Sequence, residues 1–222
     1  MFIEENISKI TDSLPCGVKL IAVSKFHPAE TVKKAYDAGH RIFGESRVQE
    51  LIVKQPALPE DIEWHFIGTL QTNKVKFIAP FISMIQSVDS LKLIREIDHQ
   101  AKKCNRLIRV LIEVHIAEED SKHGFSPEEC KALFSDGTIE QFRNIQVCGL
   151  MGMATFTDDI EQVKREFRKL RTLFEEIQSI SAYEDSTFTE LSMGMSDDYE
   201  TAIAEGSTMI RIGTAIFGAR EY

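Results

Sequence analysis

The sequence predicts a closed, parallel (β/α)8 barrel, the TIM-barrel fold of the α/β class, preceded by one extra helix. Eight short, apolar, β-favouring segments alternate with segments of helical periodicity, which is typical of a parallel sheet. Eight βα units close a barrel, and 222 residues is near the short end of the range for that fold. An open doubly wound sheet is the alternative that the pattern leaves. No linker rich in Gly, Pro or Ser divides the chain, so we expect one domain over residues 1–222.

The predicted strands are short runs rich in β-branched and aromatic residues, several of which end at a glycine or a hydroxyl residue. The first is the clearest, because the apolar run VKLIAV ends abruptly at Ser24-Lys25, shortly before Pro28. In chain order, we expect strands at residues 18–23, 40–43, 63–67, 84–88, 107–116, 146–150, 188–192 and 209–212.

The predicted helices are marked by apolar spacing and by capping residues. The extra helix has Ile3, Ile7 and Ile10 on one face, at spacings of four and three. Ser90 is a typical cap, and Ser126 followed by proline and two glutamates is a strong helix start. In chain order, we expect helices at residues 3–14, 29–38, 46–54, 73–79, from 91, from 127, 160–180 and 197–205.

Composition excludes several classes of protein. A net charge of −9 argues against general nucleic-acid binding, which needs a basic face. No segment approaches the ~18 consecutive apolar residues of a membrane helix, and the acidic N-terminus is unlike a signal peptide. The four cysteines are widely spread, so we expect reduced thiols rather than disulfides or zinc. We therefore expect a soluble, cytoplasmic protein that binds neither membrane nor metal.

The carboxyl ends of the predicted strands locate the expected site, because active sites of such barrels lie at that rim. Lys25 is the candidate nucleophile: a desolvated lysine has a lowered pKa and can condense with an aldehyde. The alternative is a rim lysine paired with a carboxylate such as Glu45. Residues at these ends are 24–25, 44–45, 65–68, 87, 113–115, 151–153, 192–194 and 211–214.

Two glycine-containing segments at the last two strand ends suit an anion. The segment from Ser192 to Ser196 and the pair Gly213-Thr214 each offer backbone N–H groups beside hydroxyls. Phosphate sites recur at this place in the fold, although glycines that only turn the chain are the alternative. Arg211 lies in an otherwise apolar strand and needs a partner, either a structural carboxylate or a ligand.

Other polar residues at the rim support alternatives that we do not favour. His65 follows Trp64, and a hydrogen-bonded core histidine is the simpler reading. His115 and His123 match no zinc spacing. A glycosidase would need two carboxylates flanking one bond, and among the acids considered only Glu45 and Glu113 fall at strand ends.

Six motifs together resemble the pyridoxal 5′-phosphate (PLP) homeostasis proteins, single-domain relatives of the N-terminal barrel of alanine racemase. They occur in the family's order between about Leu20 and Gly218, and read AVSK, FGES-x-VQE, WHFIG-x-LQ-x-NK, GLMGMA, LSMGMSDD and RIGTAIFG. The resemblance implies a fold-type III PLP barrel, with Lys25 forming a Schiff base with PLP. It implies phosphate contacts from Ser192, Gly213 and Thr214, and Arg211 against the pyridine nitrogen. Met193, Ser46 and His65 complete the set of cofactor-binding residues that we expect.

Two positions depart from the family's motifs. FGESR stands where FGENY is usual, so Ser46 and Arg47 replace an asparagine and a tyrosine. Thr69 replaces a proline in HFIGTLQ. Ser46 keeps a hydrogen-bonding group on a shorter side chain. Neither departure changes the lysine, the arginine or the phosphate segments.

We expect a PLP carrier or buffer with little or no turnover, acting as a monomer and serving apo PLP-dependent enzymes. An always-protonated arginine beside the ring weakens the electron sink. Alanine racemase takes a second acid–base tyrosine from another domain, and this chain ends at Tyr222. Of the other tyrosines, Tyr36 and Tyr183 fall outside the strand ends and Tyr199 within a helix. A PLP-dependent amino acid racemase or lyase, and a barrel binding a phosphorylated metabolite without a Schiff base, are the alternatives.

Overall fold

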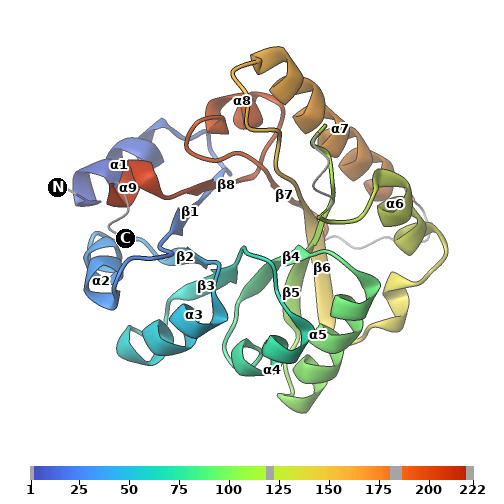
Figure 1. Cartoon of the computed structure of the whole chain (residues 1–222), viewed down its shortest axis with the longest axis horizontal. Helices are drawn as coiled ribbons and strands as arrows, with labels where there is room; N and C mark the ends of the chain where they lie inside the picture. The colour runs from blue at the N-terminus through green and yellow to red at the C-terminus, as the bar shows by residue number, and fades with distance from the viewer. Residues whose placement is uncertain (1–2, 119–122, 181–186, 219–222) are drawn as a thin grey trace.

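The computed structural model describes residues 3–118, 123–180 and 187–218 and contains a closed barrel of parallel strands in sequence order. Figure 1 shows the strands around the centre and the helices outside them. The strands are β1 (Lys19–Val23), β2 (Ile42–Glu45), β3 (Glu63–Phe66), β4 (Met84–Val88), β5 (Ile108–Glu113), β6 (Ile145–Met151), β7 (Glu190–Ser192) and β8 (Met209–Ile212). The predicted barrel is confirmed, and the open sheet is wrong because β1 pairs with β8.

Helices follow most strands, and the predicted extra helix precedes β1. The α-helices are α1 (Ile3–Ser13), α2 (Ala29–Asp37), α3 (Val48–Lys54), α4 (Val75–Ile78), α5 (Leu91–Lys103), α6 (Pro127–Ser135), α7 (Ile160–Gln178), α8 (Tyr199–Ala204) and α9 (Thr214–Phe217). Short 3-10 helices are η1 (Gln55–Ala57), η2 (Thr72–Lys74) and η3 (Ile139–Gln141). The predicted caps form: Ser90 accepts from the Leu93 N–H, and Ser126 makes a full capping box with Glu129. The helix α1 lies beside α9, and Asn6 donates to the Ile216 carbonyl (Figure 1).

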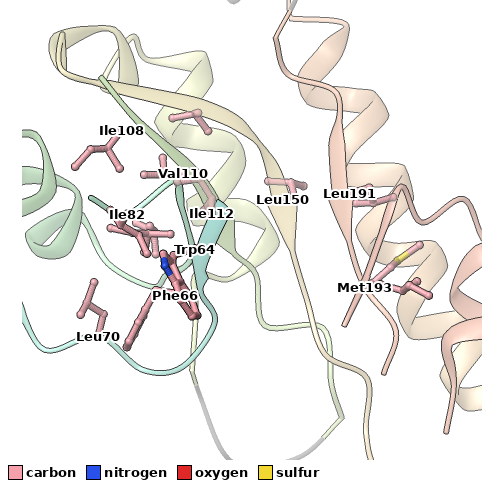
Figure 2. Packing of buried hydrophobic residues seen from close by; sticks show 14 of the residues in the cluster. Trp64, Phe66, Leu70, Ile82, Ile108, Val110, Ile112, Leu150, Leu191 and Met193 are labelled. Atoms are coloured by element: carbon pink, nitrogen blue, oxygen red, sulfur yellow. The ribbon is translucent and has the colours of Figure 1, made fainter. Parts of the chain in front are cut away.

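Apolar side chains pack in two layers, as the alternation of side chains along a strand requires. The outer layer lies between the strands and the helices, and Figure 2 shows part of it, including Trp64, Phe66, Leu150 and Leu191. The inner layer fills the barrel with Ile21, Met84, Leu111, Cys148, Met151 and Met209. The barrel is therefore packed rather than hollow at its middle.

Charged side chains close the amino-terminal end of the barrel. Lys19 of β1 pairs with Glu190 of β7, and Arg109 of β5 pairs with Glu63 of β3 at 2.9 Å. These pairs come from alternate strands, which is how side-chain layers form inside such barrels. The functional rim lies at the opposite, carboxyl-terminal end.

Six of the eight predicted strands have different bounds, and for the second and the fifth the structure gives a reason. The second strand runs from Ile42 to Glu45, so Gly44 lies inside it and does not end it. The glycine is needed there for close packing, since a Cβ would lie 3.0 Å from Ile21 and 3.1 Å from Ile67. The fifth ends at Glu113 rather than at residue 116. From Glu113 onward the chain bonds with Phe125: the Phe125 N–H donates to the Glu113 carbonyl at 2.8 Å, and the His115 N–H donates to the Phe125 carbonyl at 2.9 Å.

Candidate functional site

Lys25 follows the end of β1, and Gly213 and Thr214 follow the end of β8. These strands pair in parallel, with Ile21 opposite Arg211, and Figure 1 shows them side by side. Gly213 approaches β1 so closely that a Cβ there would lie 3.2 Å from the Val23 carbonyl oxygen. Lys25 is half-buried and Thr214 is exposed, so both lie at the mouth of the barrel. The lysine and the glycine–threonine pair therefore follow neighbouring strands at the same rim.

Arg211 begins a chain of hydrogen bonds that crosses the inside of the barrel. Its Nη1 donates to Ser192 Oγ at 2.6 Å, and its Nη2 donates to the Gly152 carbonyl at 3.0 Å. Ser192 Oγ lies 2.7 Å from Gln86 Oε1, and Gln86 Nε2 lies 2.9 Å from His65 Nδ1. Strands β8, β7, β4 and β3 each contribute one side chain. The lone arginine thus has polar partners rather than a bonded carboxylate.

Arg211 sets the donor–acceptor direction of each hydrogen bond in this series. A guanidinium only donates, so Ser192 accepts from Arg211 and gives its single proton to Gln86 Oε1. The Gln86 amide group then donates to His65 Nδ1, which places the histidine proton on Nε2. His65 Nε2 is buried and has no hydrogen-bond partner within the described part of the chain. The interior of the barrel therefore holds one donor that no described residue satisfies.

Burial controls the charges of these residues. It lowers the pKa of Arg211 to about 10, which still leaves the guanidinium protonated at neutral pH. It lowers the pKa of His65 to about 3, helped by the positive charges of Arg109 and Lys19, so this imidazole is neutral. Burial raises the pKa of the Glu113 carboxyl, and the nearby Asp89 charge raises it further while Arg211 opposes the rise. The mouth thus combines a fixed cation with an acid that holds its proton more tightly than usual.

Other predicted site residues have clear structural surroundings. Ser192 Oγ donates its proton to Gln86 Oε1 and accepts from Arg211, so this hydroxyl orients Arg211. Met193 is buried in the outer layer, and its N–H donates to the Met209 carbonyl at 3.2 Å. Ser46 is half-buried and packs against Gly68, so closely that a Cβ added to Gly68 would lie 2.7 Å from the Cβ of Ser46. Their contacts with a ligand stay predictions.

A buried ionic cluster that could not be predicted from the sequence lies against the segment from Ser24 to Phe26. Glu45 is the carboxylate that the sequence analysis considered as a partner of Lys25. Its Oε1 accepts hydrogen bonds from Ser24 Oγ at 2.6 Å and from Lys54 Nζ at 2.7 Å. Glu45 and Lys54 side chains are 0% and 7% exposed. Burial raises the pKa of Glu45, and Lys54 and Ser24 oppose that rise. A lysine at a helix end is ordinarily exposed, so the burial of Lys54 could not be predicted from the sequence.

The acids, histidines and tyrosines considered from the sequence do not gather into one site. Glu45 pairs with Lys54 of α3, whereas Glu113 lies close enough to Arg211 for the arginine charge to oppose the rise in its pKa. Across the three described ranges, no three His, Cys, Asp or Glu side chains are grouped to hold a metal ion, and no helix is long and apolar enough to cross a membrane. Tyr36 lies in α2 and Tyr199 in α8, whereas Tyr183 and Tyr222 lie outside the described residues.

Replacing Ser192 by alanine is expected to destabilise the protein by about 1–3 kcal/mol, because Arg211 and Gln86 each lose a buried partner. The measurement is the free energy of unfolding from urea denaturation. Ser8→Ala is the matched control, since Ser8 bonds Asp12 at an exposed position on α1. Equal effects of the two substitutions would mean that the bonds of Ser192 contribute little.

Fold and site together define a barrel of the alanine racemase N-terminal type. The family model "Alanine racemase, N-terminal domain" matches residues 2–221. Within that class, the chain belongs to the pyridoxal phosphate homeostasis protein family, as its motifs predicted. The relative from Aquifex aeolicus is 45% identical over 205 residues, covering 92% of this chain and 88% of the relative. The relative from Pasteurella multocida is 39% identical over 237 residues, covering 100% and 99%.

Solved structures agree with this assignment. PipY of Synechococcus elongatus without PLP superposes with a TM-score of 0.91 at 38% identity, covering 97% of this chain and 100% of PipY. PipY with PLP bound gives a TM-score of 0.87 at 37% identity, with the same coverage. Alanine racemase of Clostridium difficile, at 16% identity, has a TM-score of 0.78 and shares the fold. The predicted fold-type III barrel is thereby confirmed.

Proposed function

We propose that this protein binds PLP as a Schiff base at Lys25 and serves as an intracellular carrier or buffer of the cofactor. The observation that carries the proposal is the meeting, at one barrel mouth, of Lys25, the Gly213-Thr214 pair and the buried Arg211 chain. Relatives of 39–45% identity named pyridoxal phosphate homeostasis protein, and a PLP-bound structure of PipY, support it.

The donors present suit PLP, which carries an anionic phosphate, a pyridine ring and an aldehyde. Thr214 and the backbone at Gly213 would hold the phosphate at the exposed part of the rim. Arg211, oriented by Ser192 and Gly152, would face the ring, and the unsatisfied His65 Nε2 is a further donor in the same interior. Ser46 would line the site from its half-buried position after β2, whereas the Met193 side chain, buried in the outer layer, would support the site from behind.

Lys25 supplies the covalent step. Its amine, after losing a proton to solvent, adds to the aldehyde carbon, and loss of one water leaves a C=N double bond. Addition of water reverses the step and restores both the amine and the aldehyde. Such reversibility suits a protein that stores a cofactor and releases it to PLP-dependent enzymes that lack it.

Bound PLP would supply an electron sink for carbanions, and the chain's own residues limit that chemistry. Arg211 donates to Ser192 and Gly152 and stays protonated, so it does not pass a proton to the ring. We therefore infer little or no turnover.

The test is a titration of the purified protein with PLP, followed by absorbance before and after borohydride. Wild type should develop an absorbance band that borohydride abolishes, and Lys25→Ala should lose at least about 90% of it, because no amine remains at the site. Lys131→Ala, which removes an exposed lysine of α6, is the control and should behave as wild type. A full band in Lys25→Ala would refute the assignment. Tight PLP binding without a reducible band would instead favour non-covalent binding of a phosphorylated ligand.

Glu113 favours a second candidate, a PLP-dependent racemase or lyase. This carboxyl is 6% exposed, it holds a raised pKa, and Arg211 acts on it at the mouth, which suits a general acid or base. Solvent isotope exchange at Cα of amino acids distinguishes the two functions. The carrier proposal expects no sustained exchange. Exchange at an enzyme-like rate of about 1 per second or faster, lost in Glu113→Gln, would establish the enzyme.

A further inference from the structure

Both peptide groups that flank Lys25 are held by side chains of one helix, α3. The Ser24 carbonyl, which belongs to the peptide preceding Lys25, accepts from Lys54 Nζ at 2.9 Å. The Phe26 N–H, which belongs to the peptide following Lys25, donates to Glu50 Oε2 at 2.8 Å. Fixing both peptide planes fixes the two backbone dihedral angles of Lys25. These angles set the direction in which its side chain leaves the chain.

The side chains that make these two bonds also bond to one another, although Glu45 Oε2 is buried without a hydrogen-bond partner among the described residues. Lys54 Nζ pairs with Glu45 Oε1 at 2.7 Å and with Glu50 Oε2 at 3.4 Å, and Ser24 Oγ donates to Glu45 at 2.6 Å. The side chains of Lys54, Glu45 and Glu50 are 7%, 0% and 23% exposed. Charge pairs shielded from water in this way are short, directional and little screened by salt. The cluster thus holds the loop that carries Lys25 in one conformation.

The residue after the lysine has an unfavourable backbone conformation that the same helix holds in place. Phe26 has φ of 69°, a left-handed value that is an outlier for a bulky side chain. Such a conformation persists only where the surroundings over-determine it. Here Glu50 binds the Phe26 N–H, and the Arg47 guanidinium lies 4.4 Å from the Phe26 ring centre and 3.7 Å from Glu50. Arg47, a departure from the family's motif, thus has a structural partner in this loop.

We propose that Glu50 and Lys54 are positioning residues for Lys25, holding its backbone so that the amine points to a ligand aldehyde at the barrel mouth. The inference rests on the proposed function, because it assumes that Lys25 reacts there. Arg47 supports the same turn by covering the Phe26 ring. The cluster acts on the backbone that carries Lys25, through the Ser24 carbonyl and the Phe26 N–H.

Glu50 is the position to test, because it is partly exposed and its loss leaves the Lys54–Glu45 pair in place. In protein without PLP, amide hydrogen exchange at Phe26 should be at least about tenfold faster in Glu50→Ala than in wild type, because a bond to a charged acceptor is lost. Glu50→Gln keeps an acceptor oxygen and should stay within about threefold of wild type. Glu176→Ala, which breaks an exposed ion pair with Lys131, is the control and should change nothing.

The second measurement is the rate at which added PLP becomes trappable by borohydride. Glu50→Ala should slow it by at least about tenfold, and Glu50→Gln should restore most of the rate, because a misdirected amine loses its attack geometry. Faster Phe26 exchange with an unchanged trapping rate would overturn the inference and leave the proposed function standing. Unchanged exchange in Glu50→Ala would also overturn it. A wild-type protein that gives no trapped product would instead refute the proposed function and this inference with it.

Discussion

Replacing Lys54 by methionine is expected to lower the free energy of unfolding by about 3–5 kcal/mol at neutral pH, because breaking a buried pair leaves its partner uncompensated. Glu45 would keep only the Ser24 hydroxyl, and the Ser24 carbonyl would lose its donor. A loss of this size corresponds to a decrease in Tm of about 10 °C for a chain of this length. Urea denaturation and thermal unfolding both measure it.

A second substitution and a change of pH test the cause of that loss. The double variant Lys54→Met/Glu45→Gln should regain at least about 1 kcal/mol over Lys54→Met, because no charge is left unpaired. The pKa of Glu45 is already raised by burial, so the folded protein binds its proton more tightly than the unfolded chain does. The deficit of Lys54→Met should therefore shrink as pH falls and Glu45 becomes neutral.

The control for both measurements is Lys131→Met, which breaks the exposed pair with Glu176. Its side chains are 47% and 46% exposed, so we expect a loss below about 1 kcal/mol. A loss in Lys54→Met no larger than in this control would contradict the account of the buried cluster.

Acidification is expected to destabilise the protein through His65. Its pKa is lowered to about 3 in the folded state, whereas the unfolded chain takes up the proton near pH 6.5. Between these values the unfolded chain binds more protons, so stability falls as pH falls, by about 1.4 kcal/mol for each pH unit. From pH 6.5 to pH 4.5 the contribution is about 2 kcal/mol, because the unfolded histidine is only half protonated at pH 6.5. Unfolding free energies measured at several pH values give the slope.

The variant His65→Gln removes this titration and should flatten the slope between pH 6.5 and pH 4.5 by most of that amount. His99, exposed on α5, provides the control, and His99→Gln should leave the slope unchanged. A slope that His65→Gln does not alter would show that His65 is not buried as a neutral ring. His40 is half-buried and its pKa is also lowered, so part of the slope should persist in His65→Gln.

Much of the fold could be predicted because local pattern and tertiary structure agree. The strands β4 and β8 form with the predicted bounds, since each is an apolar run between clear breaks. Gly44 led to a wrong strand end, because a glycine after an apolar run commonly ends a strand. Here the strand continues through Gly44, which lets Ile21 and Ile67 approach its backbone. The helix α9 was not predicted, because TAIF following a glycine carries no cap or period of its own.

The candidate site could be predicted only in part. The positions of Lys25 and Arg211 follow from the strand ends and from one charged residue in an apolar strand. The partners of Arg211 could not be predicted, because Ser192 and Gln86 meet only when the barrel closes. Lys54 could not be recognised as buried either, since its helix shows ordinary i, i+4 charge spacing with Glu50.

The most direct test of the account is to identify the lysine that holds PLP. Purified protein is incubated with PLP and reduced with borohydride, and the modified peptide is mapped by mass spectrometry. The account predicts a single modified lysine, Lys25, with no modification above background in Lys25→Ala. A pyridoxyl group on another lysine, or the absence of any modification in protein that retains PLP, would contradict it.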